Sequence, residues 1–246
     1  MRMGRATAAV PRRPFLATLL AFLALGAWAT AALAQVTATP EARSAAAPVE
    51  VAAAGLTNPR GLGFAADGAL LVALGGTGGA TAGVTEIVDG CPAPVVEGVP
   101  SYRIVFAAPT GVADVASLDG TTYLLLSGGN IDGGGPANGL YEIGADGGVT
   151  LVADVSAFIR DNPVAEVPGD YDTDGQPYAL LPMADGSFWA TEGNSNQVLR
   201  LGLDGAVSRV ADLSAGHPIP TGIAPAPGGG AYVGFLGNIP YENGEA

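Results

Sequence analysis

Short apolar runs separated by glycine turns recur along the chain. Four segments share one pattern, in which a proline and a small residue precede an apolar run, a D-G or G-G turn and a second apolar run. These segments begin at Asn58, Pro109, Pro177 and Pro220. The runs are rich in Val, Leu, Tyr and Phe and are too short for a typical helix. Each segment is therefore predicted to form a β-hairpin around its turn.

A second hairpin pattern follows each of the first three segments, over residues 83–97, 139–153 and 197–211. Two hairpins make four strands in roughly 40 to 50 residues, which is the unit of a β-propeller blade. A blade buries its faces only against neighbouring blades, so several are needed. The sequence predicts an all-β fold, a β-propeller of the NHL/gluconolactonase-like type.

The fourth blade is incomplete in the sequence. Only its two inner strands are present, over 223–226 and 231–236, and Val49–Ala53 could supply an outer strand. Propellers typically have at least ~4 complete blades. A blade that lacks its outer strands leaves a strand edge with unpaired backbone groups. We therefore expect the chain to be the front part of a longer protein, with about four blades present of six.

The N-terminus has the pattern of an export signal. Four arginines and an apolar stretch over 15–31 precede a small-x-small motif at 32–34, so residues 1–34 are predicted to be a signal peptide. Arg12 and Arg13 resemble a twin-arginine signal, which leaves the general and the twin-arginine routes both open. The alternative is an uncleaved membrane anchor. Residues 35–48 are predicted to be a flexible linker before a propeller domain at 49–246, in a periplasmic or extracellular protein.

The charge of the chain limits its expected binding partners, and its cysteine content excludes an internal disulfide. The chain has 10 Lys plus Arg and 23 Asp plus Glu, and four of the arginines lie in the predicted signal while no carboxylate does. Such an acidic mature chain repels nucleic acid and anionic membrane surfaces, so neither is expected as a partner beyond the export signal. Cys91 is the one cysteine and has no partner for an internal disulfide.

Three stretches carry a resemblance to a known family. Residues 55–73, 177–211 and 220–241 resemble the ScyD/ScyE family of exported bacterial β-propeller proteins, and the similarity extends over about residues 50–246. The resemblance implies the fold and export but no established reaction. It also implies further blades beyond those present here. Similar short motifs occur in NHL-type, gluconolactonase-like and quinone-dependent sugar dehydrogenase propellers.

The candidate binding site follows from propeller topology. Loops that lead into each inner strand, and loops between second and third strands, lie on one face over the central channel, where a concave binding site is expected. Gly and Asn are common in turns for conformational reasons. Each candidate residue in these loops could therefore stabilise a turn instead of contacting a ligand. The expected ligand is a small molecule, a glycan or an extracytoplasmic protein. The candidate residues are Asn58, Arg60, Asp132, Glu192, Asn194, Asn196, His217 and Thr221.

An acidic motif at 169–175 raises the possibility of a Ca²⁺ site. Asp170, Asp172 and Asp174 alternate before Gly175, like the first half of an EF-hand loop. The twelfth position, where an EF-hand carries a bidentate Glu, is Leu181. The motif is therefore either a looser Ca²⁺ site, completed by Asp161 or Glu166, or a solvated acidic loop.

The chain lacks strong catalytic motifs. It has no G-x-S-x-G, no metal-binding His pair and no phosphate-binding glycine loop. The favoured hypothesis is an exported non-catalytic binding or scaffold protein. The alternative is a propeller enzyme, either a gluconolactonase-like hydrolase or a quinone-dependent sugar dehydrogenase with His217 as base. Asn58–Arg60 occupies the position where the lactonases carry a metal-binding Glu. A structural envelope protein is a third hypothesis.

Overall fold

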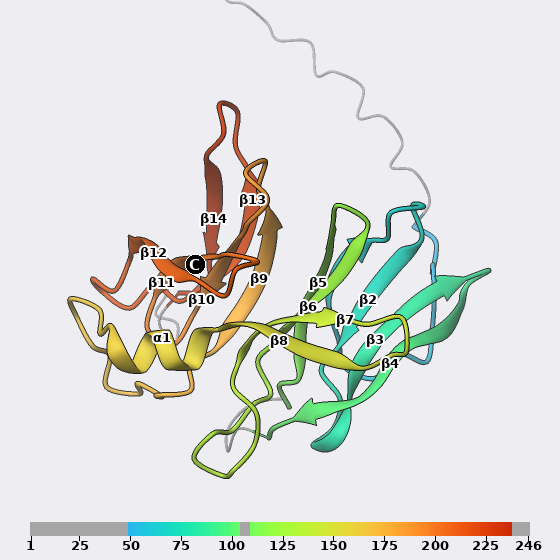
Figure 1. Ribbon diagram of the computed structural model, residues 1–246, viewed down its shortest axis with the longest axis horizontal. Coiled ribbons are helices and arrows are strands. Elements are labelled where there is room, and N and C mark those ends of the chain that lie inside the picture. The colour runs from blue at the N-terminus through green and yellow to red at the C-terminus, as the bar shows by residue number, and fades with distance from the viewer. Residues whose placement is uncertain (1–48, 104–108, 238–246) are drawn as a thin grey trace, which may run out of the picture. The chain divides into compact units, whose positions relative to one another are not determined.

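The computed structural model describes residues 49–103 and 109–237. Their strands form four antiparallel sheets in chain order, here called blades one to four (Figure 1). Blade one contains β1 (Pro59–Phe64), β2 (Leu70–Leu74), β3 (Gly79–Val88) and β4 (Cys91–Ser101). Blade two contains β5 (Val112–Leu118), β6 (Thr121–Leu126), β7 (Gly139–Ile143) and β8 (Val149–Asp154). Blade three contains β9 (Pro177–Pro182), β10 (Phe188–Glu192), β11 (Gln197–Leu201) and β12 (Val207–Asp212), and blade four contains β13 (Pro220–Pro225) and β14 (Ala231–Phe235).

The predicted all-β propeller architecture is confirmed. Within each sheet every strand pairs with the strand next to it in sequence, and both hairpins of each complete blade lie where the repeats predicted them. Blade four has two strands among the described residues. The predicted signal peptide and linker lie outside the described residues. No helix in the described part of the chain is long and apolar enough to cross a bilayer.

Two details of the sequence prediction were wrong. Val49–Ala53 forms no strand. Val49 and Val51 are 99% and 83% exposed, so the segment buries too little apolar surface to be held against a sheet. The helix α1 (Val155–Asp161) was not predicted. Asp154 caps it by accepting a hydrogen bond from the Ala157 amide at 2.7 Å, which is a common N-cap arrangement. A helix of 7 residues directly after a strand leaves too little periodicity to be recognised.

Two of the D-G turns take the backbone conformation expected of two-residue hairpin turns. Asp119 and Gly120, between β5 and β6, have φ of 51° and 83°. Asp89 and Gly90, between β3 and β4, have φ of 50° and 78°. Positive φ at both central positions defines the turn whose twist matches paired strands, so these dipeptides fix the hairpin registers.

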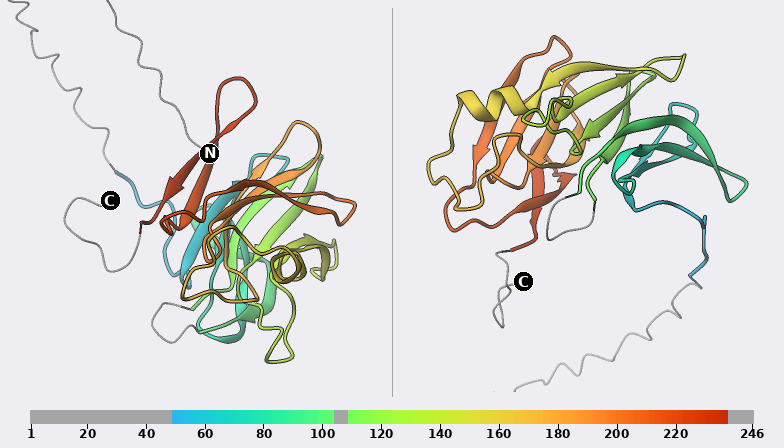
Figure 2. Two further views of the ribbon diagram at one scale, coloured as in Figure 1. Left: turned by 90° about the vertical axis from the view of Figure 1, so that its left-hand side faces the viewer. Right: turned by 90° about the horizontal axis from the view of Figure 1, so that it is seen from below.

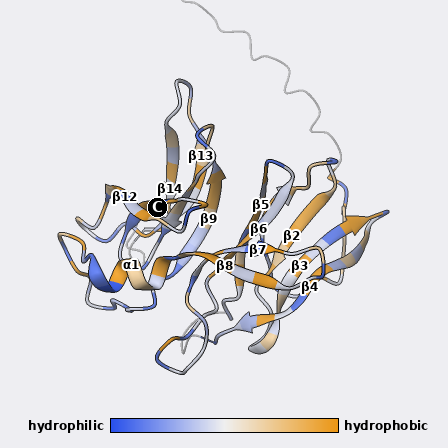
Figure 3. Cartoon of the chain, in the orientation of Figure 1, coloured by the Kyte–Doolittle hydropathy of each residue, from blue (hydrophilic) through white to orange (hydrophobic). Residues whose placement is uncertain are grey.

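The core lies between blades and is centred on blade two. Alternate side chains of β6 point to opposite faces of the sheet. Leu124 and Leu126 join an apolar cluster with blade one, whereas Tyr123 and Leu125 join another with blade three. Tyr123 also makes an edge-to-face contact with Phe188 of blade three, with ring centroids 5.2 Å apart. In Figure 3, β2 of blade one is coloured as hydrophobic, in agreement with the burial of its central residues.

Small residues allow the inner strands to pack closely. Strand β1 packs on β5, β5 on β9 and β9 on β13. A Cβ at Gly61 would lie 1.9 Å from a carboxylate oxygen of Asp114, and one at Gly111 would lie 2.4 Å from the Gly75 carbonyl oxygen. At Gly222 of blade four, the equivalent repeat position, a Cβ would meet nothing within 4 Å. The repeated small residue therefore reflects backbone contact between neighbouring blades.

Apolar side chains are exposed on the first and last strands. Leu62 and Phe64 of β1 are each 65% exposed, and Tyr232 and Phe235 of β14 are 64% and 51% exposed. In blade two, by contrast, both faces of β6 are buried. Burial is thus concentrated where one blade has neighbours on both sides.

The two repeat glycines provide a direct test of this packing. We expect Gly111→Ala to lower the Tm by about 4–10 °C, because overpacking against backbone costs about 1–3 kcal/mol. Gly222→Ala should change the Tm by less than about 2 °C, since its Cβ enters open space. Thermal unfolding followed by circular dichroism measures both. Equal effects would contradict the proposed role of close inner-strand packing.

Candidate functional site

The loop face contains a cavity of about 530 Å³. Its walls come from the segments β4–β5, β6–β7, β8–β9 and β10–β11, as the topology predicted. The lining residues are Tyr102, Thr110, Ser127, Gly129, Asn130, Asp132, Asn138, Asp170, Asp172, Asp174, Gly175, Gln176 and Asn194. A volume of this size is typical of small-molecule sites.

Asp174 is the structural centre of the acidic loop. The residue is 7% exposed, and both carboxylate oxygens are occupied. Oδ1 accepts from the Arg160 guanidinium at 2.6 Å and Oδ2 accepts from the Ile131 amide at 3.0 Å. These contacts join the β6–β7 loop, α1 and the β8–β9 segment, so a buried carboxylate is stabilised by charge-assisted hydrogen bonds.

The helix α1 supplies the cation for this network. Arg160, in its last turn, also contacts the carboxylate of Asp132 at 3.1 Å. Asp132 remains 73% exposed in its side chain, so this second ion pair contributes little to stability. The helix lies beside β7 and β12 (Figure 2), which fixes Arg160 at the edge of the cavity.

The other two aspartates of the motif connect to the next loops. Asp172 accepts from the Asp174 amide at 2.9 Å through Oδ1, and its own amide donates to Asn194 at 2.6 Å. Asn194 also donates to the Asp170 carbonyl oxygen at 2.9 Å. The carboxylate of Asp170 lies 3.4 Å from His217 Nε2. The motif therefore forms a hydrogen-bonded loop on the cavity wall.

This loop does not form a metal cage in the described residues. No group of three or more His, Cys, Asp or Glu side chains there converges as metal ligands. The Asp174 oxygens are taken by Arg160 and the Ile131 amide. Neither Asp161, in α1, nor Glu166, which donates its amide to Ser214 at 3.0 Å, completes a set. Ca²⁺ binding at Asp170, Asp172 and Asp174 stays a prediction, and the residues present do not fit a preformed site.

Glu192 organises the β10–β11 loop from a fully buried position. It is 0% exposed and does not line the cavity. Oε1 accepts from the amides of Gln176 at 2.7 Å and Asn194 at 3.0 Å. Oε2 accepts from the amide of Ser195 at 2.8 Å and from its hydroxyl. Four donors account for the burial of this carboxylate, so its role is structural.

Asn196 and His217 form a second structural pair. Asn196 is 0% exposed, and its side chain accepts from the Ile219 amide at 2.7 Å. Its Nδ2 lies 2.6 Å from His217 Nδ1. Both residues have positive φ, 60° and 51°, which is uncommon outside glycine. The contacts hold the β12–β13 loop in place beside blade three.

The remaining predicted site residues lie away from the cavity lining. Asn58 and Arg60 both donate to the carbonyl oxygen of Pro109, at 2.7 and 2.9 Å, so they attach blade one to the β4–β5 segment. Thr221 is half-buried on β13. Of the predicted residues, the cavity brings together Asp132, Asp170, Asp172, Asp174 and Asn194.

Sequence reasoning did not single out Asn138, at the end of the β6–β7 loop, or Ser156, in α1. Asn138 accepts from the Gly129 amide at 2.7 Å and donates to the carbonyl oxygens of Asp174 and Gly175, at 3.3 and 2.9 Å. Ser156 donates to the Asp174 carbonyl oxygen at 2.7 Å. The available signal in the sequence was the position of these two polar residues directly beside apolar strand segments. Polar side chains at such positions are often buried, and buried amides and hydroxyls need hydrogen-bond partners.

Asp114 is a buried carboxylate outside the cavity. It lies on β5, where its oxygens accept from the amides of Val115 and Leu180, each at 2.8 Å. Burial raises the pKa of Asp114 from 3.8 to about 6, against the opposing effect of the two amide hydrogen bonds. Because Leu180 is on β9, this carboxylate links the inner strands of blades two and three.

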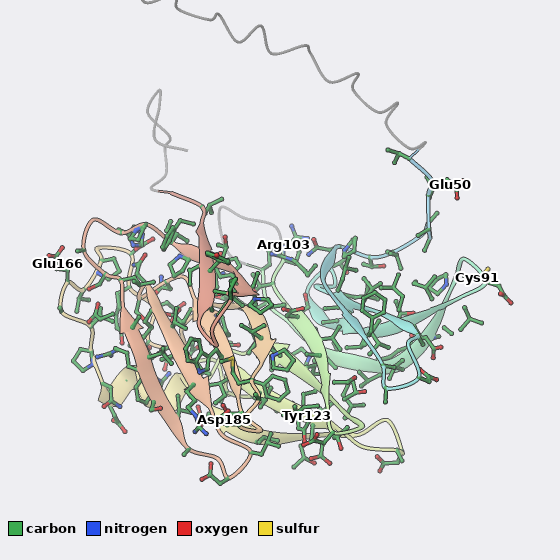
Figure 4. All side chains as sticks on the ribbon, turned by 90° about the horizontal axis from the view of Figure 1, so that it is seen from above. Glu50, Cys91, Arg103, Tyr123, Glu166 and Asp185 are labelled. Atoms are coloured by element: carbon green, nitrogen blue, oxygen red, sulfur yellow. The ribbon has the colours of Figure 1, made fainter. Side chains whose placement is uncertain are left out.

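Cys91 and the labelled acidic side chains do not contribute to the cavity. Cys91 lies at the exposed tip of the β3–β4 hairpin (Figure 4). Asp185 pairs with Arg200 at 3.0 Å on blade three. Glu166 also lies outside the cavity lining.

Replacing Glu192 tests its structural role. Glu192→Gln puts an amino group opposite at least one of the four donors, so we expect a loss of about 2–4 kcal/mol in unfolding free energy. Urea denaturation at pH 7 measures the loss. Glu142→Gln, at an exposed position on β7, is the control and should change stability by less than about 0.5 kcal/mol. Equal stability of the two variants would contradict the structural role.

Asp114 predicts a specific dependence of stability on pH. Its folded pKa of about 6 lies above the unfolded value of 3.8, so the folded state holds the proton more tightly. Stability from this residue is complete below about pH 4 and is lost as pH rises to about 6, by on the order of 3 kcal/mol.

Asp114→Asn should remove this dependence. We expect the difference in unfolding free energy between wild type and variant to change between pH 4 and pH 7 and to be flat above pH 7. Urea titrations at several pH values measure it. A difference that is constant across this range would show that Asp114 titrates normally.

Comparisons with known proteins give no family. No protein-family model matches the chain, and no curated protein matches it. Solved structures that resemble it include a virginiamycin B lyase from Staphylococcus aureus, at 16% identity and a TM-score of 0.41, over 68% of this chain and 45% of that one. A protein from Lactobacillus plantarum matches at 17% identity and a TM-score of 0.45, over 74% and 49%.

The PQQ-bound aldose sugar dehydrogenase from Streptomyces coelicolor matches at 15% identity and a TM-score of 0.49, over 75% of this chain and 58% of that one. The chain thus spans about half the length of these structures. These similarities carry no conclusion about the activity of this chain.

Proposed function

We propose that the protein is an exported, non-catalytic β-propeller binding protein of the ScyD/ScyE type. Its ligand is a small polar molecule held in the loop-face cavity. The cavity of about 530 Å³, built from loops of different blades, carries the proposal. Concave sites of this size with convergent polar groups are the usual places for small ligands.

The hydrogen bonding of the candidate acids and bases supports a non-catalytic role. A general acid or base must reach the substrate proton directly or through one water. Glu192 is buried in contacts with four donors. His217 has one ring nitrogen next to Asn196 and the other next to Asp170. These groups stabilise loops and have little capacity left for chemistry.

Binding is tested by thermal shift of the exported chain against sugars, amines, carboxylic acids and CaCl₂. We expect at least one class to raise the Tm by about 2 °C or more at saturation. Tyr102 lines the cavity and is 43% exposed, so we expect it to provide part of the contact area with the ligand. Tyr102→Ala is expected to weaken the ligand so identified by about tenfold.

Tyr232→Ala is the matched control, because Tyr232 is 64% exposed on β14 and does not line the cavity. It should leave affinity unchanged. No shift with any class, or equal weakening by both variants, would overturn the cavity as the binding site. Turnover of lactones, or of sugars with a quinone cofactor, would overturn the non-catalytic proposal.

A further inference from the structure

The cavity wall carries excess negative charge. Four aspartates line it, and one guanidinium, that of Arg160, contacts two of them. Four carboxylates therefore face one guanidinium, and the ring of His217 contacts the carboxylate of Asp170, so carboxylates outnumber cationic groups at the wall. Asp132 and Asp170 are 73% and 69% exposed in their side chains. This field favours cationic ligands and disfavours anionic ones.

Hydrogen-bond acceptors predominate in the wall. Each of the exposed aspartates, Asp132, Asp170 and Asp172, has one carboxylate oxygen that accepts no hydrogen bond from the described residues. The amides of Asn138 and Asn194 are occupied on both oxygen and nitrogen by loop contacts. The amino groups of Asn130 and Gln176 are the remaining side-chain amide donors. A complementary ligand therefore needs to donate more hydrogen bonds than it accepts.

A buried hydroxyl beside the cavity is a second, independent sign of a ligand. Ser127 lines the cavity and is 6% exposed, yet its Oγ has no hydrogen-bond partner in the described structure. An unpaired buried hydroxyl is unfavourable, because it has lost its hydrogen bonds to water and gained none in the protein. A donor group reaching in from the cavity would satisfy it.

The aromatic ring at the cavity fits the same chemistry. Tyr102 contributes to the lining and is partly exposed. Tyrosine faces attract ammonium groups by cation–π interaction. The neighbouring cation, Arg103, donates to the Thr77 carbonyl oxygen at 3.4 Å, so it is directed to the β2–β3 loop.

We infer that the ligand of this cavity is a small organic cation of the diamine or polyamine class. An ammonium group donates three hydrogen bonds and accepts none, which matches an acceptor-rich, negatively charged wall. More than one ammonium is expected because the available carboxylates belong to two segments, Asp132 to β6–β7 and Asp170 and Asp172 to β8–β9. The inference rests on the proposed binding function and specifies its ligand class.

Calorimetric titration of the exported chain with putrescine tests the inference, with glucose, sodium acetate and CaCl₂ as parallel probes. We expect putrescine to bind, and its affinity to fall several-fold between 20 and 200 mM NaCl as salt screens the aspartates. Asp172→Asn should weaken it about 5- to 10-fold. The variant keeps an Oδ1 acceptor for the Asp174 amide, so the loop contact survives.

Asp204→Asn is the matched control. Asp204 is an exposed turn residue between β11 and β12 whose Oδ1 accepts from the Ala206 amide at 3.1 Å, so it undergoes the same change of charge away from the cavity. Putrescine affinity should be the same as in wild type. Equal weakening by Asp172→Asn and Asp204→Asn would overturn the site, because only overall charge would then matter.

The four probes separate this inference from the binding function. Binding of glucose without putrescine would overturn the cationic ligand and retain a binding cavity. Binding of CaCl₂ that excludes putrescine, with loss in Asp172→Asn, would replace the amine by a metal ion. If none of the four probes binds and no compound of the wider ligand screen raises the Tm, the proposed function itself would be overturned.

Discussion

The structure depends on the burial of blade two between its two neighbours. Each complete blade is a twisted four-stranded sheet that cannot bury both faces alone. The side chains of β6 alternate between an apolar cluster with blade one and another with blade three. Asp114 adds a polar contact between inner strands by accepting from the Leu180 amide. These interfaces fix the spacing of the loops above them.

The loop face is consequently held together by polar contacts between segments. Asp174 joins three segments, and Glu192 and Asn138 each join two. Such buried polar groups persist because nearly all their hydrogen-bonding capacity is satisfied. The cavity walls are therefore built from side chains that first stabilise loops, and the exposed carboxylates and Ser127 are what remains for a ligand.

Local patterns in the sequence predicted the fold well. The D-G turns at 119–120 and 89–90 and the short apolar runs identify hairpins because both act over a few residues. They also predicted the loop face, since strand order fixes which connections share it. Helix α1 was missed, because a helix of 7 residues directly after a strand carries almost no periodic signal.

The candidate site was predicted only in part. Asp132, Asp170, Asp172, Asp174 and Asn194 line the cavity, whereas Glu192, Asn196 and His217 hold loops from buried or partly buried positions. A polar residue in a loop has the same sequence signature in either role. Its role depends on which distant segment supplies a hydrogen-bond partner, such as the Gln176 amide for Glu192.

The most direct test of the loop-face cavity as the ligand site is hydrogen exchange of the protein with and without saturating putrescine. Amides in the loops 127–138 and 169–176, which form the cavity wall, should exchange more slowly with ligand. Amides in the opposite turns at 119–120 and 202–205 should be unchanged. Protection at those turns, or on the exposed strands β1 and β14, with unchanged loops would contradict a ligand site on the loop face.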